Sequence, residues 1–172
     1  ILAKTRIVYI GMLYDKLMNP KGALTALVLS MLLTGSLSVE AARKKTVQKI
    51  KVACVGNSIT YGTGIQDREH FSYPVQLQKM LGDKYQVGNF GKPGATLLNH
   101  GHRPYMKQEE YRQAMAFKGD IAVIHLGIND TDPRNWPNYR DEFVKDYLSI
   151  MDSLRAANPK VRFIIARMTP IA

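Results

Sequence analysis

Short runs of apolar residues alternate along the chain with longer stretches in which apolar residues recur every three or four positions. The short runs predict buried strands, and the longer stretches predict helices with one apolar face. The strands are expected at residues 50–55, 85–90, 121–126 and 161–166. The helices are expected at residues 73–81, 108–117 and 139–157. The apolar face of the last helix consists of Phe143, Tyr147, Ile150, Met151 and Leu154.

Continuous apolar strands that alternate with helices predict an α/β fold, in which a parallel sheet is covered by helices on both faces. Open sheets of this kind bind their ligands at the carboxyl ends of the strands. We therefore expect functional residues in the segments that directly follow the first three strands.

Each of these segments holds a residue suited to ester chemistry: Ser58, Gly94 and Asn129. A serine just past a strand can project its hydroxyl into a cleft, and a glycine lets its backbone N–H approach a reacting carbonyl oxygen. An asparagine offers a side-chain NH₂ donor. Two backbone N–H groups and one amide directed at one point would form an oxyanion hole. Each segment alone is also a common turn or cap, but their shared order and position favour a site.

Together the segments Gly56-Asn57-Ser58-Ile59-Thr60, Gly91-Lys92-Pro93-Gly94 and Gly127-Ile128-Asn129-Asp130 resemble the sequence blocks of the SGNH (GDSL-like) hydrolase superfamily. The resemblance extends from Ile50 to about Pro170. It implies that Ser58 is the nucleophile, and that the Ser58 N–H, the Gly94 N–H and the Asn129 side chain form the oxyanion hole. The implied fold is a flavodoxin-like three-layer α/β/α sandwich with about five parallel strands.

Two departures from known patterns accompany the resemblance. Asn57 stands where the superfamily usually has Asp. Asn keeps a local hydrogen bond but carries no charge, so we expect this change alone not to abolish activity. Thr60 stands where a Gly-x-Ser-x-Gly motif would have its second glycine, which argues against the nucleophile elbow of ordinary α/β-hydrolases.

A serine hydroxyl needs a base, normally a histidine oriented by a third group. In the superfamily both come from a late Asp-x-x-His block, which is not found before Ala172. We therefore expect a domain truncated at its C-terminus, with about four of five strands present, and a fragment that is inactive as given.

None of the four histidines is an expected base. His125 lies inside the third strand, whereas His100 and His102 belong to a solvated loop after the second. Asp67 and His70 form a literal Asp-x-x-His but come too early in the chain order, and we interpret them as a coincidence. They are nevertheless the only route by which residues 1–172 could complete a triad.

Charge and cysteine content exclude several other functions. The net charge is +10, and the basic residues that produce it are scattered along the chain. This pattern favours a solvated basic surface over nucleic-acid binding. The single cysteine, Cys54, excludes an internal disulfide framework and a cysteine zinc site, and its apolar neighbours predict a core position. No metal or organic cofactor is implied.

The N-terminal part of the chain has the pattern of a secretory signal peptide, which we place at residues 18–41 with cleavage near Ala41. Its apolar run is too short to span a membrane, so no stable membrane insertion is expected and the protein is predicted to be secreted or periplasmic. Residues 1–17 are interpreted as an over-extended N-terminus, and residues 42–172 as the hydrolase domain, incomplete at its C-terminus.

Within the superfamily the opening GNSITYG is most similar to the sialate O-acetylesterase or acetylxylan-esterase branch. This implies a serine esterase that removes short acyl groups, above all acetyl, from a small-molecule or glycan ester through an acyl-enzyme. Two alternatives stay open. One is a lysophospholipase or thioesterase of the same superfamily, which needs an acyl-chain groove. The other is a non-catalytic carbohydrate-binding relic.

Overall fold

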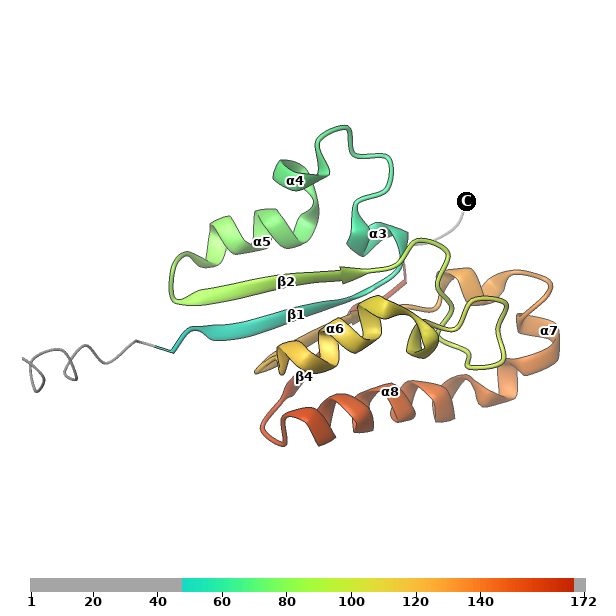
Figure 1. Ribbon diagram of the computed structural model, residues 1–172. Helices are drawn as coiled ribbons and strands as arrows, with labels where there is room; N and C mark the ends of the chain where they lie inside the picture. Colours follow the sequence, from blue (N-terminus) through green and yellow to red (C-terminus); the bar gives the residue numbers. More distant parts are fainter. Residues whose placement is uncertain (1–47, 169–172) are drawn as a thin grey trace, which may run out of the picture. The chain divides into compact units, whose positions relative to one another are not determined.

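The computed structural model describes residues 48–168. Their four strands form one sheet in the order β2-β1-β3-β4, and every neighbouring pair is parallel (Figure 1). The strands are β1 (Ile50–Gly56), β2 (Tyr85–Gly91), β3 (Ile121–His125) and β4 (Arg162–Ile165). All four predicted strands are confirmed, and each boundary is correct to within one residue.

Six α-helices and three short 3₁₀ helices connect the strands in residues 48–168. The α-helices are α3 (Ser58–Tyr61), α4 (Arg68–Phe71), α5 (Tyr73–Leu81), α6 (Glu109–Phe117), α7 (Trp136–Tyr139) and α8 (Phe143–Ala157). The 3₁₀ helices are η1 (Tyr105–Lys107), η2 (Ile128–Thr131) and η3 (Arg140–Glu142).

The prediction of one helix over residues 139–157 is wrong at its start. The backbone of Tyr139 leaves the helical region, with φ of −130° and ψ of 6°. The segment before Phe143 is therefore divided between α7 and η3, and the long helix begins only at Phe143. Its predicted apolar face is confirmed: Ile150 and Leu154 are buried, and Phe143, Tyr147 and Met151 pack against the core.

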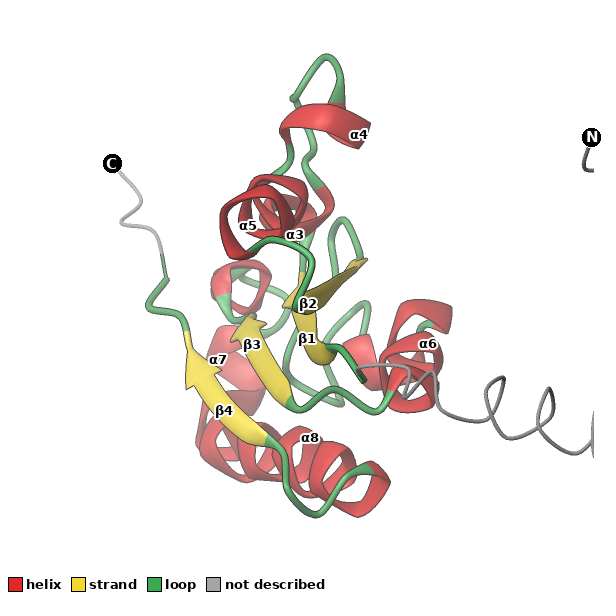
Figure 2. Ribbon diagram, turned by 90° about the vertical axis from the view of Figure 1, so that its left-hand side faces the viewer, coloured by secondary structure: helices red, strands yellow, loops and turns green. Residues whose placement is uncertain are grey.

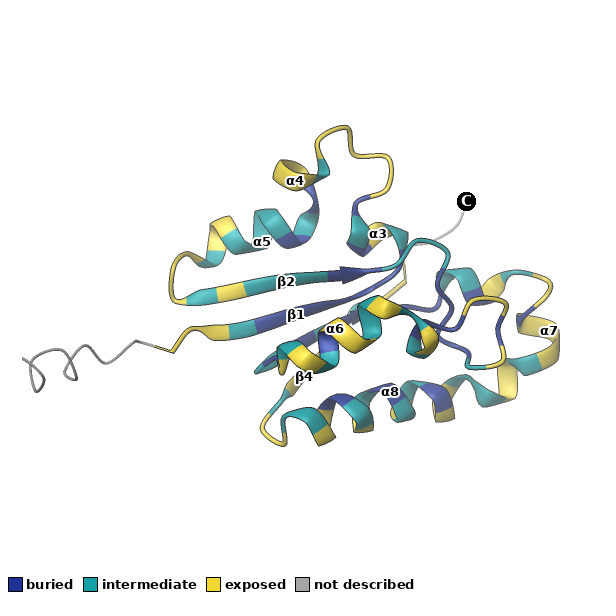
Figure 3. Cartoon of the chain, viewed as in Figure 1, coloured by how far each residue is buried: buried dark blue, intermediate teal, exposed yellow. Residues whose placement is uncertain are grey.

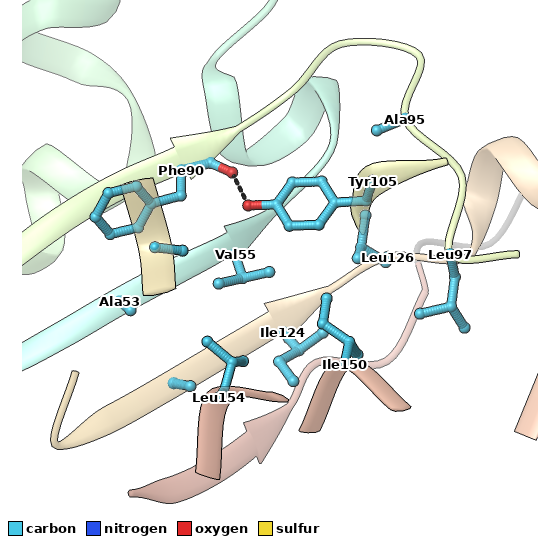
Figure 4. Close-up of a cluster of buried hydrophobic side chains, with 12 residues drawn as sticks. Ala53, Val55, Phe90, Ala95, Leu97, Tyr105, Ile124, Leu126, Ile150 and Leu154 are labelled. Carbon is cyan, nitrogen blue, oxygen red and sulfur yellow. Dashed lines mark hydrogen bonds between the residues drawn. The ribbon is translucent and has the colours of Figure 1, made fainter. Parts of the chain in front are cut away.

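The helices lie on both sides of the sheet, so the three-layer arrangement is confirmed. Figure 2 shows α3, α4 and α5 on one face and α6 and α8 on the other. The main core lies between the sheet and the layer of α6 and α8, and it includes Val55, Ile124 and Ile150 (Figure 4). The buried Tyr105 hydroxyl donates to the carbonyl of Phe90 at 2.6 Å, so this polar group has a partner inside the core.

Strand β4 is an edge of the sheet and is less covered than the rest. Ile164 and Ile165 are 54% and 57% exposed, whereas the middle of β1 is fully buried (Figure 3).

Cys54 is a core residue, as its apolar neighbours predict. It is fully buried in β1, and this burial raises the pKa of its thiol to about 11, although a hydrogen bond with Tyr73 acts in the opposite direction. The thiol is therefore neutral at physiological pH and unsuited to nucleophilic attack.

The expected signal peptide at residues 18–41 and the segment 1–17 lie outside the described residues and stay predictions. The start of the domain at residue 42 and its last four residues lie outside them as well. Between Gln48 and Met168, no helix combines the length and apolar character that crossing a membrane requires.

Candidate active site

The carboxyl ends of β1, β2 and β3 lie side by side, because Gly56 pairs with Gly91 on one side and with His125 on the other. Ser58, Gly94 and Asn129 follow these three strand ends within four residues and are all partly exposed. Hydrogen bonds link the segments: the Lys92 N–H donates to the Gly56 carbonyl at 2.9 Å, and the Asn129 amide donates to the Ala95 carbonyl at 2.8 Å. The three loops therefore come together at the carboxyl ends of the strands, as the sequence predicts.

Ser58 is the first residue of the one-turn helix α3. The Asn57 side chain caps this helix by accepting a hydrogen bond from the Ile59 N–H at 3.0 Å, so the local bond expected of Asn57 is present. Asn57 and Thr60 are buried, whereas Ser58 is partly exposed. Within residues 48–168, neither the N–H nor the hydroxyl of Ser58 has a hydrogen-bond partner.

The end of β2 lies very close to helix α3. A Cβ atom at Gly91 would lie 2.6 Å from the Cα of Tyr61 and 2.7 Å from the carbonyl carbon of Thr60, closer than real Cβ atoms come. Only glycine fits here, and the close approach fixes the distance between α3 and the loop that follows β2.

Gly94 lies in a tight turn directly after β2. The Ala95 N–H donates to the Lys92 carbonyl at 3.1 Å, and Gly94 has a φ of +75°. Proline at the second position and glycine with positive φ at the third are typical of a type II turn. In the described part of the chain, the Gly94 N–H has no hydrogen-bond partner.

Asn129 lies in η2, which begins after Gly127 at a φ of +122°. One hydrogen of its side-chain amide is used in the bond to Ala95, and the other has no partner in residues 48–168. The Asn129 carbonyl accepts a hydrogen bond from the buried Asn135 side chain at 2.9 Å, which fixes the backbone of this residue.

Three buried polar side chains hold the loop of residues 95–105, a role that the sequence pattern does not predict. The carboxylate of Asp130 accepts from Leu97 and Leu98, that of Asp146 accepts from Asn99, and the Asn135 amide oxygen accepts from the His102 N–H. Burial raises the pKa of Asp130, and its backbone hydrogen bonds act against that rise. The loop that begins at Gly94 is thus fixed from the side of η2 and α8.

Three of the four histidines contact neighbouring polar side chains. His70 forms a real pair with Asp67, with its Nδ1 3.0 Å from both carboxylate oxygens, but both side chains are more than half exposed on the α4 segment. No hydrogen bond in residues 48–168 links this pair to Ser58. His100 contacts Glu142 at 2.7 Å, and His102 contacts Asn135.

The same part of the chain offers no obvious metal site. Among residues 48–168, no three His, Cys, Asp or Glu side chains gather closely enough to hold a metal ion.

Comparison with known proteins gives three findings. Residues 54–172 match the sequence model of the GDSL-like Lipase/Acylhydrolase family. A stretch of 106 residues is 50% identical to an acetylxylan esterase of Xylanibacter ruminicola, and the match covers 62% of this chain and 22% of that protein. The matched stretch therefore spans only about a fifth of that relative's length.

The third finding concerns solved structures. AlinE4, an SGNH-hydrolase family esterase, superposes with a TM-score of 0.50 at 20% identity, covering 69% of this chain and 58% of that one. A variant of AlinE4 gives a TM-score of 0.51 at 20% identity over 72% and 62% of the two chains. At this identity the likeness shows the fold alone. From the match over residues 54–172, the chain belongs to the GDSL-like lipase/acylhydrolase family.

Proposed function

We propose that the protein is a serine esterase that removes short acyl groups, above all acetyl, from a carbohydrate. The observation that carries the proposal is the group of hydrogen-bond donors at the strand ends. The Ser58 N–H, the Gly94 N–H and one hydrogen of the Asn129 amide are all without partners in residues 48–168, on loops that hydrogen bonds join.

In the proposed reaction the Ser58 hydroxyl attacks the ester carbonyl carbon and the carbonyl oxygen becomes an oxyanion. The three free donors would stabilise that charge, and removal of one such donor typically lowers the rate by ~10²–10³. Collapse of the intermediate expels the sugar hydroxyl and leaves an acyl-serine. Water then attacks the same carbon, and the acid leaves with Ser58 restored.

The Ser58 proton must pass to a base during the attack, and the base gives it to the sugar oxygen as that group leaves. In the second half of the reaction the base takes a proton from the attacking water and gives it to the Ser58 oxygen as the acid leaves. By the resemblance this base is the histidine of a late Asp-x-x-His block, which is not found in residues 1–172. The exposed pair of Asp67 and His70 is the alternative within the chain.

Two features support a short acyl group on a sugar. The relative that is 50% identical over 106 residues is named an acetylxylan esterase. The loop beside Gly94 presents polar side chains: His100, His102 and Arg103 are exposed, and the buried groups of the loop are satisfied by Asp130, Asn135 and Asp146. A lysophospholipase or thioesterase would need an apolar groove for its acyl chain in this region.

The test is a substrate profile of the intact gene product. We expect acetate release from acetylated xylan, and a kcat/KM for nitrophenyl acetate about tenfold or more above that for nitrophenyl octanoate, because a small acyl site excludes extra methylenes. A kcat/KM that rises with chain length would support the lysophospholipase or thioesterase reading instead. Binding of xylan without any ester turnover would support the carbohydrate-binding relic.

A further inference from the structure

We propose that Asp130 is a positioning residue for the reaction: its buried carboxylate holds the loop after β2 so that the Gly94 N–H and the Asn129 amide meet at one acyl oxygen. This inference rests on the proposed esterase function and deepens it, since it concerns a side chain that touches neither substrate nor nucleophile.

The hydrogen bonds of Asp130 are short and point in one direction. One carboxylate oxygen accepts from the Leu98 N–H at 2.7 Å, and the other accepts from the Leu97 N–H at 2.9 Å. Asp130 is fully buried, so water does not compete for these bonds. Two consecutive backbone N–H groups that donate to the two oxygens of one carboxyl group fix both the position and the orientation of that stretch.

The position of Asp130 in the chain links this restraint to the oxyanion donors. Asn129 is the preceding residue, and its amide donates to the Ala95 carbonyl at 2.8 Å. Two consecutive residues of η2 therefore hold Ala95, Leu97 and Leu98 together. Because Gly94 is covalently joined to Ala95, any shift of this stretch moves the Gly94 N–H relative to Asn129.

Asp146 provides a matched comparison on the same loop. It is 6% exposed, and its carboxylate accepts from the Asn99 N–H at 2.7 Å and from the Asn99 side chain at 2.9 Å. It comes from α8, and it holds the loop five residues beyond Gly94. If Asp130 only stabilised the loop, loss of either carboxylate would have the same consequences.

The experiment compares Asp130→Asn with Asp146→Asn in the intact gene product. An asparagine presents one acceptor oxygen and one NH₂ donor where aspartate presents two acceptors, so one of the two backbone N–H groups of Leu97 and Leu98 loses its partner. For Asp130→Asn we expect kcat on nitrophenyl acetate to fall roughly 10–100-fold with KM within about threefold, a smaller loss than removal of an oxyanion donor itself. For Asp146→Asn we expect kcat to stay within about threefold at a similar fall in melting temperature.

Equal losses of kcat in the two variants would overturn the inference and leave the esterase function intact. Asp130→Ser serves as the second variant, since its hydroxyl accepts one hydrogen bond and adds no volume. If neither Asp130 variant folds while Asp146→Asn does, Asp130 is purely structural and the positioning role is overturned.

Amide hydrogen exchange makes the outcome independent of turnover. If the unaltered protein shows no turnover that depends on Ser58, the esterase proposal fails. The inference then stands only if Asp130→Asn accelerates exchange of the amides from Gly94 to Leu98 more than Asp146→Asn does. Unchanged exchange in that stretch would overturn it.

Discussion

Replacing Ser58 by alanine is expected to lower kcat on an acetyl ester by roughly 10⁴–10⁶-fold, the size of loss seen when a catalytic serine is removed from a hydrolase. The substitution deletes the nucleophile and leaves the surrounding site in place. Because the Ser58 hydroxyl has no hydrogen-bond partner in residues 48–168, the free energy of unfolding should change by only about 0.5 kcal/mol or less.

The measurement is turnover of nitrophenyl acetate by the intact gene product, with Ser72→Ala as the matched control. Ser72 is a second serine close to α3, since a Cβ at Gly62 would lie 2.9 Å from its Cβ. It is buried, and its hydroxyl is without a partner in the described structure. We expect Ser72→Ala to keep its turnover. Turnover in Ser58→Ala above about one hundredth of the unaltered rate would contradict the assignment of the nucleophile.

Gly91→Ala is expected to destabilise the domain by about 3 kcal/mol or more, at the upper end of overpacking effects. The added methyl group would overlap the backbone of Tyr61, including its nitrogen, and its nearest neighbours are main-chain atoms that cannot rotate away. Relief requires α3 to move off the end of β2. Ser58 would then shift relative to Gly94, so activity should be lost together with stability.

The loss of stability is measured by urea-dependent proteolysis, in which cleavage within residues 48–168 is followed. Gly64→Ala is the control. Gly64 also has a positive φ, +84°, but nothing lies within 4 Å of the position that its Cβ would take. Alanine there should cost only about 1 kcal/mol of backbone strain. If Gly91→Ala unfolds no more easily than Gly64→Ala, the close approach of β2 and α3 is wrong.

The sheet could be predicted from the sequence because β1, β3 and β4 are short, mainly apolar runs bounded by glycine or polar residues. The more polar β2 also ends at a glycine. Three successive strands are followed by Ser58, Gly94 and Asn129, and parallel strands end on the same side of a sheet. The order of these residues in the sequence was therefore enough to place them at the carboxyl ends of the strands. The helix start at Phe143 could not be predicted, because the periodic pattern extends through Tyr139 while its backbone turns away.

The contacts of the polar residues that fix the loop could not be predicted from the sequence pattern either. Asp130 contacts Leu97 and Leu98 across 33 and 32 residues, and Asp146 contacts Asn99 across 47. An aspartate in a polar segment is usually solvent-exposed, and periodicity carries no signal for its burial. Such contacts emerge only when tertiary structure brings η2 and α8 against the loop.

The central claim is that Ser58 is the residue that carries the acyl group, and covalent labelling tests it most directly. The intact gene product is incubated with a fluorophosphonate, which reacts with an activated serine, and the modified peptide is identified by mass spectrometry. We predict one adduct, on Ser58, that is formed in step with the loss of esterase activity and is absent from Ser58→Ala. Esterase activity that is lost through an adduct on another residue, or that survives full modification of Ser58, would contradict the account.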